Sequence, residues 1–234
     1  MTTVSDDLIE QLKELDTPTV CNALESVVPQ RRGYGYTTDP LVCTRPELGS
    51  MVGYARTACI RAMHPSDARG EAARDIQHGY YQYIDDGPKP AIIVIQDLDG
   101  ESRGYGSFWG EVNSNIHCGL GCVGLITDGS VRDIPDIAPG FQMLADRIGP
   151  SHAFVHPVSY GGGINVAGMR VTSGDLIHAD QHGAVVIPND KANEVPDAAA
   201  AIARRERVII NAAQEDGFSF ERLKKAWGDA AEVH

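Results

Sequence analysis

The segment from residue 91 to 97, AIIVIQD, is the feature that most constrains the fold of this chain. Its nearly continuous apolar run is typical of a strand covered on both faces, as in a parallel sheet between two layers. The run is strand-length and far too short to cross a membrane as a helix. Helical patterns lie on both sides of it, over residues 68–84 and after Gly110. This alternation predicts an α/β fold.

The amino-terminal part of the chain predicts two helices within residues 5–28. Ser5 is a suitable N-cap for the first helix. Thr17 is predicted to cap the second helix, with Pro18 at its first position. Residues 51–63 alternate enough to predict a strand.

The carboxy-terminal part of the sequence has a different residue pattern. Residues 152–188 contain short apolar runs split by glycines, which predict an added layer of strands. An Ala-rich pattern then predicts C-terminal helices over about 190–227. The sequence shows no repeat and no flexible linker. We therefore expect residues 1–234 to form a single domain.

Composition excludes several classes of function. The formal net charge is -12, whereas binding to nucleic-acid phosphates requires clustered basic residues. The amino terminus is acidic and lacks the basic and apolar regions of a secretion signal. The five cysteines are scattered and odd in number, as is usual for thiols in a reducing cytosol. We expect a cytoplasmic protein that binds neither nucleic acid nor membranes.

The stretch from residue 104 to 136 carries the residues best suited to chemistry. Three glycines precede Glu111, a helical pattern follows, and a short strand over residues 123–127 leads toward Arg132 and Asp133. A helix, a turn and a strand fit between Glu111 and the Arg-Asp pair, and such a unit can bring both its ends to one sheet edge. Two carboxylates and a guanidinium beside exposed backbone amides would suit a cation and an oxo-acid.

The position of the Arg132-Asp133 pair adds to this interpretation. A short helix is predicted to begin near Ile134, and amides at a helix start favour anions. An isolated pair of this kind would otherwise be an ordinary surface ion pair that holds a turn.

A dinucleotide-binding interpretation of the glycines is weaker. Gly104, Gly106 and Gly110 follow a strand, and Asp128 at the end of the next strand could bind a ribose. However, the spacing is not GxGxxG, and six residues intervene between the strand and the first glycine. A structural loop or a loop for a small anion fits the pattern better.

Two further motifs have alternative interpretations. The spacing of Cys118 and Cys122 permits metal ligation, but no second Cys/His pair lies at zinc spacing. The HADQHGA segment is predicted to be a turn in which Asp180 accepts hydrogen bonds from backbone amides. A catalytic role for His178 or His182 is the alternative.

Three ordered motifs carry a resemblance to a known family. They are Gly110-Glu111, then Gly121-x-x-Gly124-Leu-Ile-Thr-Asp128-Gly129-x-x-Arg132-Asp133, then Gly174-Asp175-x-x-x-x-Asp180-x-x-Gly183-x-x-x-x-Pro188. This trio resembles the RraA-like family, which includes class II 4-hydroxy-4-methyl-2-oxoglutarate aldolases, RraA regulators of ribonuclease E and proteins labelled dimethylmenaquinone methyltransferases. The resemblance covers most of residues 16–210. It implies a swivelling β/β/α three-layer sandwich, assembled as homotrimers or hexamers with sites between subunits.

The resemblance also implies roles for individual residues. Asp133 would hold Mg²⁺ or Mn²⁺, directly or through water, and Arg132 would bind a 2-oxo acid and act in catalysis. Glu111 would be the second catalytic residue, at the acid position of the signature. The backbone at the start of the following helix would bind the substrate carboxylate, at Gly110, Val112 and Asn113.

The sequence departs from the aldolase pattern at two positions. Glu111 stands where the aldolases usually carry Asp, and its longer side chain would shift a bound water. Asn22 stands where they tend to place an acid that orients metal-bound water from a neighbouring subunit. Glu206 could be another outer-shell acid from across the interface, although a solvated helix face is the plainer interpretation. Asp128 is a further outer-shell candidate.

The resemblance implies a metal-dependent carbon–carbon lyase that releases pyruvate from 4-hydroxy-2-oxo acids, with oxaloacetate decarboxylation as a related activity. The absence of lysine from the central stretch disfavours a Schiff-base aldolase. No clean glycine fingerprint supports a methyltransferase. The alternative is a non-catalytic regulator of ribonuclease activity, which would need only a protein-binding surface.

Overall fold

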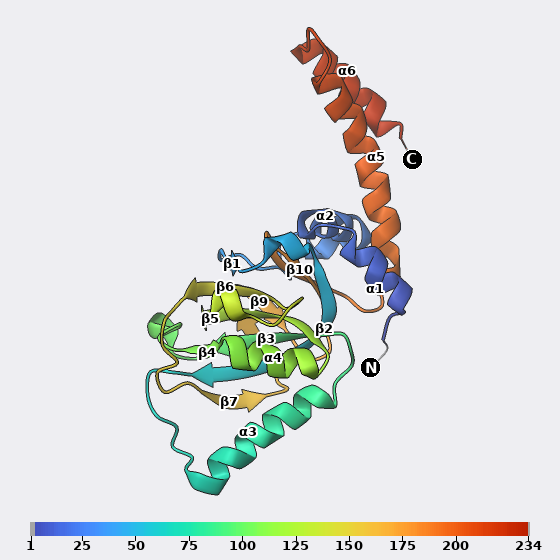
Figure 1. Cartoon of the computed structure of the whole chain (residues 1–234). Helices are drawn as coiled ribbons and strands as arrows, with labels where there is room; N and C mark the ends of the chain where they lie inside the picture. The colour runs from blue at the N-terminus through green and yellow to red at the C-terminus, as the bar shows by residue number, and fades with distance from the viewer. Residues whose placement is uncertain (1–2, 234) are drawn as a thin grey trace.

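The computed structural model describes residues 3–233 and has a mixed α/β architecture (Figure 1). The helices are α1 (Asp6–Lys13), α2 (Thr17–Val27), α3 (Gly70–Asp85), α4 (Glu111–Gly119), α5 (Val195–Ala213) and α6 (Phe220–Ala231). The strands are β1 (Val42–Cys43), β2 (Met51–Arg61), β3 (Ala91–Asp97), β4 (Ser107–Trp109), β5 (Cys122–Val131), β6 (Gln142–Ile148), β7 (His156–Tyr160), β8 (Ile164–Val166), β9 (Met169–Val171), β10 (Leu176–Asp180) and β11 (Gly183–Ile187). The predicted α/β class is confirmed.

β3 lies in the middle of the main sheet, whose strand order is β1-β6-β5-β3-β2-β10-β11. It pairs in parallel with β2 on one side and with β5 on the other. β6 continues the parallel part, whereas β10 and β11 are antiparallel. Residues 92–95 are completely buried. The prediction of a strand covered on both faces is therefore confirmed.

The side chains of β3 alternate between two cores, which explains why residues 91–95 include no polar side chain. Ile93 and Ile95 pack in a cluster that includes Tyr80 of α3. Ile92 and Val94 pack on the other face, under the hairpin of β8 and β9. A third cluster joins α1, α2 and the start of α5 to β10 and β11.

The C-terminal helices form an arm that projects from the rest of the fold (Figure 1). α5 packs on α2 at its beginning, and α6 folds back along α5. Phe220 and Trp227 of α6 are 65% and 52% exposed, and Ile210 and Phe218 are also exposed. Within the described residues, no helix is long and apolar enough to span a membrane. The arm thus presents large apolar side chains to solvent.

The start of α2 differs from the prediction by one residue. Asp16, not Thr17, is the N-cap, because its side chain accepts a hydrogen bond from an amide in the first turn. The Thr17 hydroxyl lies 3.0 Å from Nδ1 of the buried His178 instead. The Asp180 carboxylate accepts hydrogen bonds from the amides of Thr17 and His182. The predicted turn between β10 and β11 is present, and it also holds the start of α2.

β5 is longer than the predicted strand over residues 123–127. It continues to Val131 because Ser130 and Val131 pair with β4 on one side and with β6 on the other. The helix predicted near Ile134 is a single 3-10 turn, Ile134–Asp136. Arg132 and Asp133 therefore lie between a strand and this turn, and no α-helix starts directly after them.

Asp128 is buried in β5, beside the end of β3. Its Oδ1 atom accepts a hydrogen bond from the Asp97 amide at 2.7 Å. The Asp97 carboxylate in turn accepts one from the Gly104 amide at 2.7 Å. Burial raises the pKa of Asp128 to about 6, and the nearby Asp97 carboxylate adds to the increase. Asp128 therefore holds the end of β3, and the Asp97 carboxylate tethers the loop that follows β3.

This raised pKa predicts how stability depends on pH. The folded protein retains a proton on Asp128 that the unfolded chain releases between about pH 4 and pH 6. The stability that this bound proton gives to the folded protein is therefore lost as the pH rises through that window. Asp128→Asn keeps the acceptor oxygen without the charge, so we expect the free energy of unfolding at pH 7.5 to rise by about 1–2 kcal/mol.

Urea unfolding over a pH series checks this expectation. The dependence of the free energy of unfolding on pH should flatten between pH 4 and pH 6 in Asp128→Asn. Asp75→Asn, at an exposed position on α3, is the control and should leave the profile unchanged. A lower free energy of unfolding at pH 7.5 in Asp128→Asn would contradict the expectation that the buried negative charge of Asp128 destabilises the fold.

Candidate active site

Two segments far apart in the sequence meet where β4 and β5 end. β4 pairs in parallel with the last residues of β5, with Trp109 opposite Val131. The Arg132 amide then donates a hydrogen bond to the Trp109 carbonyl at 2.9 Å. The residues that follow the two strands, Gly110-Glu111 and Arg132-Asp133, therefore emerge at the same edge of the sheet. The structure brings together the central residues that the sequence singled out.

The Asp133 carboxylate points back toward the start of α4. Asp133 has a left-handed backbone conformation, with φ of 54° and ψ of 41°. Its Oδ2 atom accepts a hydrogen bond from the Glu111 amide at 3.3 Å. A Cβ atom on Gly110 would lie 2.3 Å from that same oxygen. A larger residue at position 110 would therefore displace the carboxylate from its present position.

The Arg132 guanidinium lies beside this carboxylate without being fully engaged by it. Its Nε atom is 3.8 Å from Asp133 Oδ2, too long for a hydrogen bond. That Nε is buried and has no hydrogen-bond partner within residues 3–233. Both side chains are 35% exposed. The guanidinium therefore retains donors for an anionic ligand.

The start of α4 provides further donors. Gly110 is the N-cap and has no side chain with which to cap the helix, and the Asp133 carboxylate accepts a hydrogen bond from the Glu111 amide. The amides of Val112 and Asn113 belong to the first turn, where a helix offers no internal acceptor. Such amides favour a carboxylate or another anion. The α-helix start at this edge is that of α4, where the family resemblance placed the substrate carboxylate, whereas the helix predicted to begin near Ile134 is only a 3-10 turn.

The donor set fits a hydrated hard cation better than a closed metal site. No cluster of three or more His, Cys, Asp or Glu side chains suited to a metal occurs in the part of the chain that the structure describes. One carboxylate at Asp133, with solvent access, matches Mg²⁺ or Mn²⁺, ions that commonly keep several waters and take few protein ligands. The Glu111 side chain is exposed at the same edge.

The outer-shell candidates do not reach this edge within one chain. Asn22 and Glu206 are exposed on α2 and α5, which lie at the other end of the fold from α4 (Figure 1). Asp128 is occupied by the amide of Asp97. A role for Asn22 or Glu206 would therefore require a neighbouring subunit.

Sequence analysis missed the side chains that hold α4 in place. Tyr80 and Tyr81 of α3 hydrogen-bond to His117 and Asn113 of α4, respectively. The only sequence signal is the tyrosine-rich run HGYYQY at the end of α3. Nothing in that run indicates which helix the tyrosines contact.

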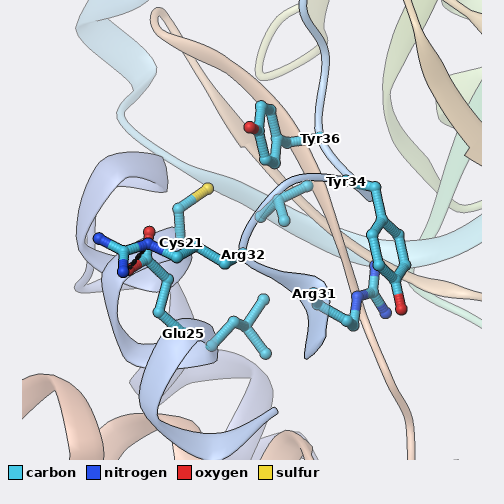
Figure 2. A pocket seen from close by; sticks show the side chains of 8 residues that line it. Cys21, Glu25, Arg31, Arg32, Tyr34 and Tyr36 are labelled. Atoms are coloured by element: carbon cyan, nitrogen blue, oxygen red, sulfur yellow. Dashed lines mark ion pairs between the residues drawn. The ribbon is translucent and has the colours of Figure 1, made fainter. Parts of the chain in front are cut away.

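A small, partly open hollow lies elsewhere, between α2, the loop that follows it and β11 (Figure 2). Its free space of about 20 Å³ would hold about one water molecule. Arg32 and Glu25 at its wall are paired with each other at 3.1 Å. Burial raises the pKa of the Cys21 thiol to about 11, which keeps it protonated at neutral pH. This hollow has neither the room nor the reactivity of a substrate site.

The chain is similar to a known protein family and to two known proteins. The profile of the RraA-like family, described as Aldolase/RraA, matches residues 11–186. Protein DlpA of Legionella pneumophila is 28% identical over 156 residues, which cover 63% of this chain and 23% of DlpA. An uncharacterized protein of Methanocaldococcus jannaschii is 31% identical over 121 residues, which cover 50% of this chain and 57% of that protein. The chain thus spans less than two thirds of either relative.

Solved structures share the fold. A protein from Pseudomonas syringae pv. tomato has a TM-score of 0.70 and 24% identity, covering 97% of this chain and 99% of that one. Streptomyces coelicolor RraAS2, described as an unusual member of the RNase ES inhibitor RraA family, has a TM-score of 0.67 and 21% identity, covering 88% and 97%. The predicted RraA-like fold is confirmed. Since the matched region contains both segments of the candidate site, this chain belongs to the RraA-like family.

Proposed function

We propose that this protein is a divalent-metal-dependent carbon–carbon lyase that releases pyruvate from 4-hydroxy-2-oxo acids, with oxaloacetate decarboxylation as a related activity. The supporting observation is the meeting of three groups at one sheet edge. These are the Asp133 carboxylate, the partly unpaired Arg132 guanidinium and the first-turn amides of α4 that follow Glu111. Together they offer a cation ligand and two kinds of donor for a 2-oxo acid.

In this proposal each residue has a distinct part in the reaction. Asp133 holds Mg²⁺ or Mn²⁺, which when bound disperses the negative charge that develops on the 2-oxo oxygen. Arg132 donates hydrogen bonds to the oxo-acid and adds fixed positive charge beside that oxygen. The amides of Val112 and Asn113 bind the substrate carboxylate. These contacts align the bond between C3 and C4 for cleavage.

Glu111 is the proposed proton carrier. Through a water, it takes the proton from the 4-hydroxyl group while the bond between C3 and C4 breaks. The bonding electrons move toward the 2-oxo group, and a proton returned to C3 completes pyruvate. In decarboxylation of oxaloacetate, carbon dioxide leaves in place of the carbonyl product. The exposed position of Glu111 is consistent with exchange of this water.

We also propose that the protein is a homo-oligomer, a trimer or a hexamer. Within one chain Asp133 is the proposed cation ligand and Glu111 the proposed proton carrier, whereas Glu206 lies on α5, away from α4. The α5–α6 arm exposes apolar side chains that a neighbouring subunit would cover. In such an assembly Asn22 or Glu206 of another copy would lie near the metal waters. The first residue is an amide, so Glu206 is the stronger proton acceptor of the two.

A ribonuclease regulator is the second candidate. It is favoured by the likeness of the fold to Streptomyces coelicolor RraAS2. That function would require an exposed protein-binding surface, and it would not require Asp133, Arg132 and an open helix start to converge. Binding to a ribonuclease E fragment together with absence of lyase activity would favour the regulator.

Three substitutions separate the proposed roles. Asp133→Asn removes the anionic oxygen, so Mn²⁺ affinity and kcat should both collapse. Arg132→Lys keeps the charge but loses the planar fork, so it should spare Mn²⁺ binding and lower kcat/KM by roughly 30- to 1000-fold. Glu111→Gln should spare binding of both Mn²⁺ and oxalate, a pyruvate analogue, and mainly lower kcat.

Calorimetric titration of Mn²⁺ and oxalate, with pyruvate-release assays on a panel of oxo-acids with and without EDTA, measures these effects. Asp136→Asn, on the exposed turn next to the site, is the matched control and should behave as wild type. Full activity in EDTA would refute the metal requirement. Wild-type Mn²⁺ affinity in Asp133→Asn would show that the carboxylate holds a turn instead.

The arm provides a separate prediction about assembly. Phe220→Ser combined with Trp227→Ser removes two large exposed aromatic side chains from α6. We expect subunit affinity to fall by roughly 30-fold or more, because buried aromatic anchors dominate interfaces. Light scattering over a dilution series measures the mass. Glu221→Ser in the same helix is the control, and an unchanged mass in the double variant would exclude the arm from the interface.

A further inference from the structure

Two neighbouring tyrosines of α3 hold α4, the helix whose first turn faces the candidate site. The Tyr81 hydroxyl lies 2.8 Å from Oδ1 of Asn113. The Tyr80 hydroxyl lies 2.8 Å from Nε2 of His117, one turn further along α4. Asn113 is itself in the first turn of α4, so the α3 contacts reach the amides that would bind a carboxylate.

The hydrogen-bond partners fix the orientation of the Asn113 side chain. Its Nδ2 donates to the carbonyl of Phe108, the middle residue of β4. A carbonyl can only accept, so the amide cannot be flipped without bringing two oxygen atoms together. Oδ1 therefore faces α3, and Tyr81 must be the donor in their hydrogen bond. Asn113 thus joins three elements, β4, α4 and α3, through one side chain.

His117 fixes the next turn of the helix in the same way. Its Nδ1 lies 2.7 Å from the Asn113 carbonyl, which can only accept, so Nδ1 carries the proton and Nε2 accepts from Tyr80. The His117 side chain is completely buried against Trp109, with ring centroids 4.4 Å apart. Burial lowers the pKa of His117 to about 4, so the ring is neutral and this arrangement persists at physiological pH.

We propose that Tyr81 is a positioning residue, which acts through Asn113 to aim the first-turn amides of α4 at the substrate carboxylate. This inference rests on the proposed function and deepens it, because it names the contact that sets substrate affinity. Tyr81 itself touches neither the substrate nor the cation. Its hydroxyl restrains Asn113, and a helix start that is displaced by a fraction of an ångström binds an anion less well.

Tyr81→Phe tests the proposal by removing one hydroxyl and keeping the ring. Loss of one neutral hydrogen bond predicts oxalate affinity in the presence of Mn²⁺ about 3- to 10-fold weaker, with KM for the oxo-acid raised by a similar factor. Mn²⁺ affinity without oxalate should change much less, since Asp133 follows β5 and its contact with α4 is one long hydrogen bond of 3.3 Å from the Glu111 amide. The kcat should change less than KM. A general loss of structure would instead lower metal affinity and kcat as well.

Tyr83→Phe is the matched control, with the same chemical change in the same helix. The Tyr83 hydroxyl accepts from the Thr57 amide at 3.0 Å and lies 2.6 Å from Ser173 Oγ, away from α4. It should reduce stability to a comparable degree and leave oxalate affinity as in wild type. Equal weakening of oxalate binding by Tyr81→Phe and Tyr83→Phe would overturn the proposal, because the effect would then reflect α3 as a whole.

A double-mutant cycle shows whether Tyr81 acts through Asn113. Asn113→Ala should weaken oxalate binding at least as much as Tyr81→Phe, and adding Tyr81→Phe to it should have no further effect. Additive losses would overturn the proposed route through Asn113.

The outcomes also distinguish this inference from the proposed function. If wild type releases pyruvate while Tyr81→Phe binds oxalate like wild type, the positioning role alone is wrong. If wild type binds oxalate and Tyr81→Phe weakens it, but no oxo-acid is cleaved, the positioning role stands and the lyase activity is wrong. A wild-type protein that binds no oxalate would overturn both.

Discussion

The parallel pairing of β4 with the last residues of β5 is the contact on which the candidate site depends. β4 has three residues, yet its register with β5 decides that Gly110 and Asp133 leave the sheet side by side. The hydrogen bond from the Arg132 amide to the Trp109 carbonyl extends this pairing by one residue. The left-handed conformation of Asp133 then turns its carboxylate back onto the Glu111 amide, and the missing side chain of Gly110 leaves room for it.

The electrostatics of this edge explain why it is suited to a ligand. One oxygen of Asp133 accepts a long hydrogen bond from the Glu111 amide, and the Arg132 guanidinium lies near it without a full hydrogen bond. The N-cap of α4 is a glycine, which has no side chain to bind the other first-turn amides. A structural ion pair would satisfy these groups within the chain. Here negative and positive groups are kept partly unpaired and partly exposed, which favours a cation and an anion bound together.

The rest of the fold supports this edge from two directions. α3 fixes the direction of α4 through Tyr80 and Tyr81, so that the helix start is anchored on its buried side. At the other end of the fold, α5 and α6 leave the sheet and expose apolar surface (Figure 1). The support of α4 is formed within one chain, whereas the exposed apolar side chains of the arm are the surface that the proposed assembly would cover.

The sequence by itself determined the class of fold and the identity of the central residues. The apolar run of β3 predicted a strand covered on both faces. A strand whose residues do not alternate between apolar and polar must be buried by a layer on each face. The spacing of Glu111, Arg132 and Asp133 indicated that they meet. Only the tertiary structure decided that Asp133 accepts a hydrogen bond from the first amide of α4, that Asp128 binds the Asp97 amide, and that Tyr81 reaches Asn113. Those facts depend on strand register, one left-handed residue and contacts between distant helices, and local sequence patterns do not encode such long-range geometry.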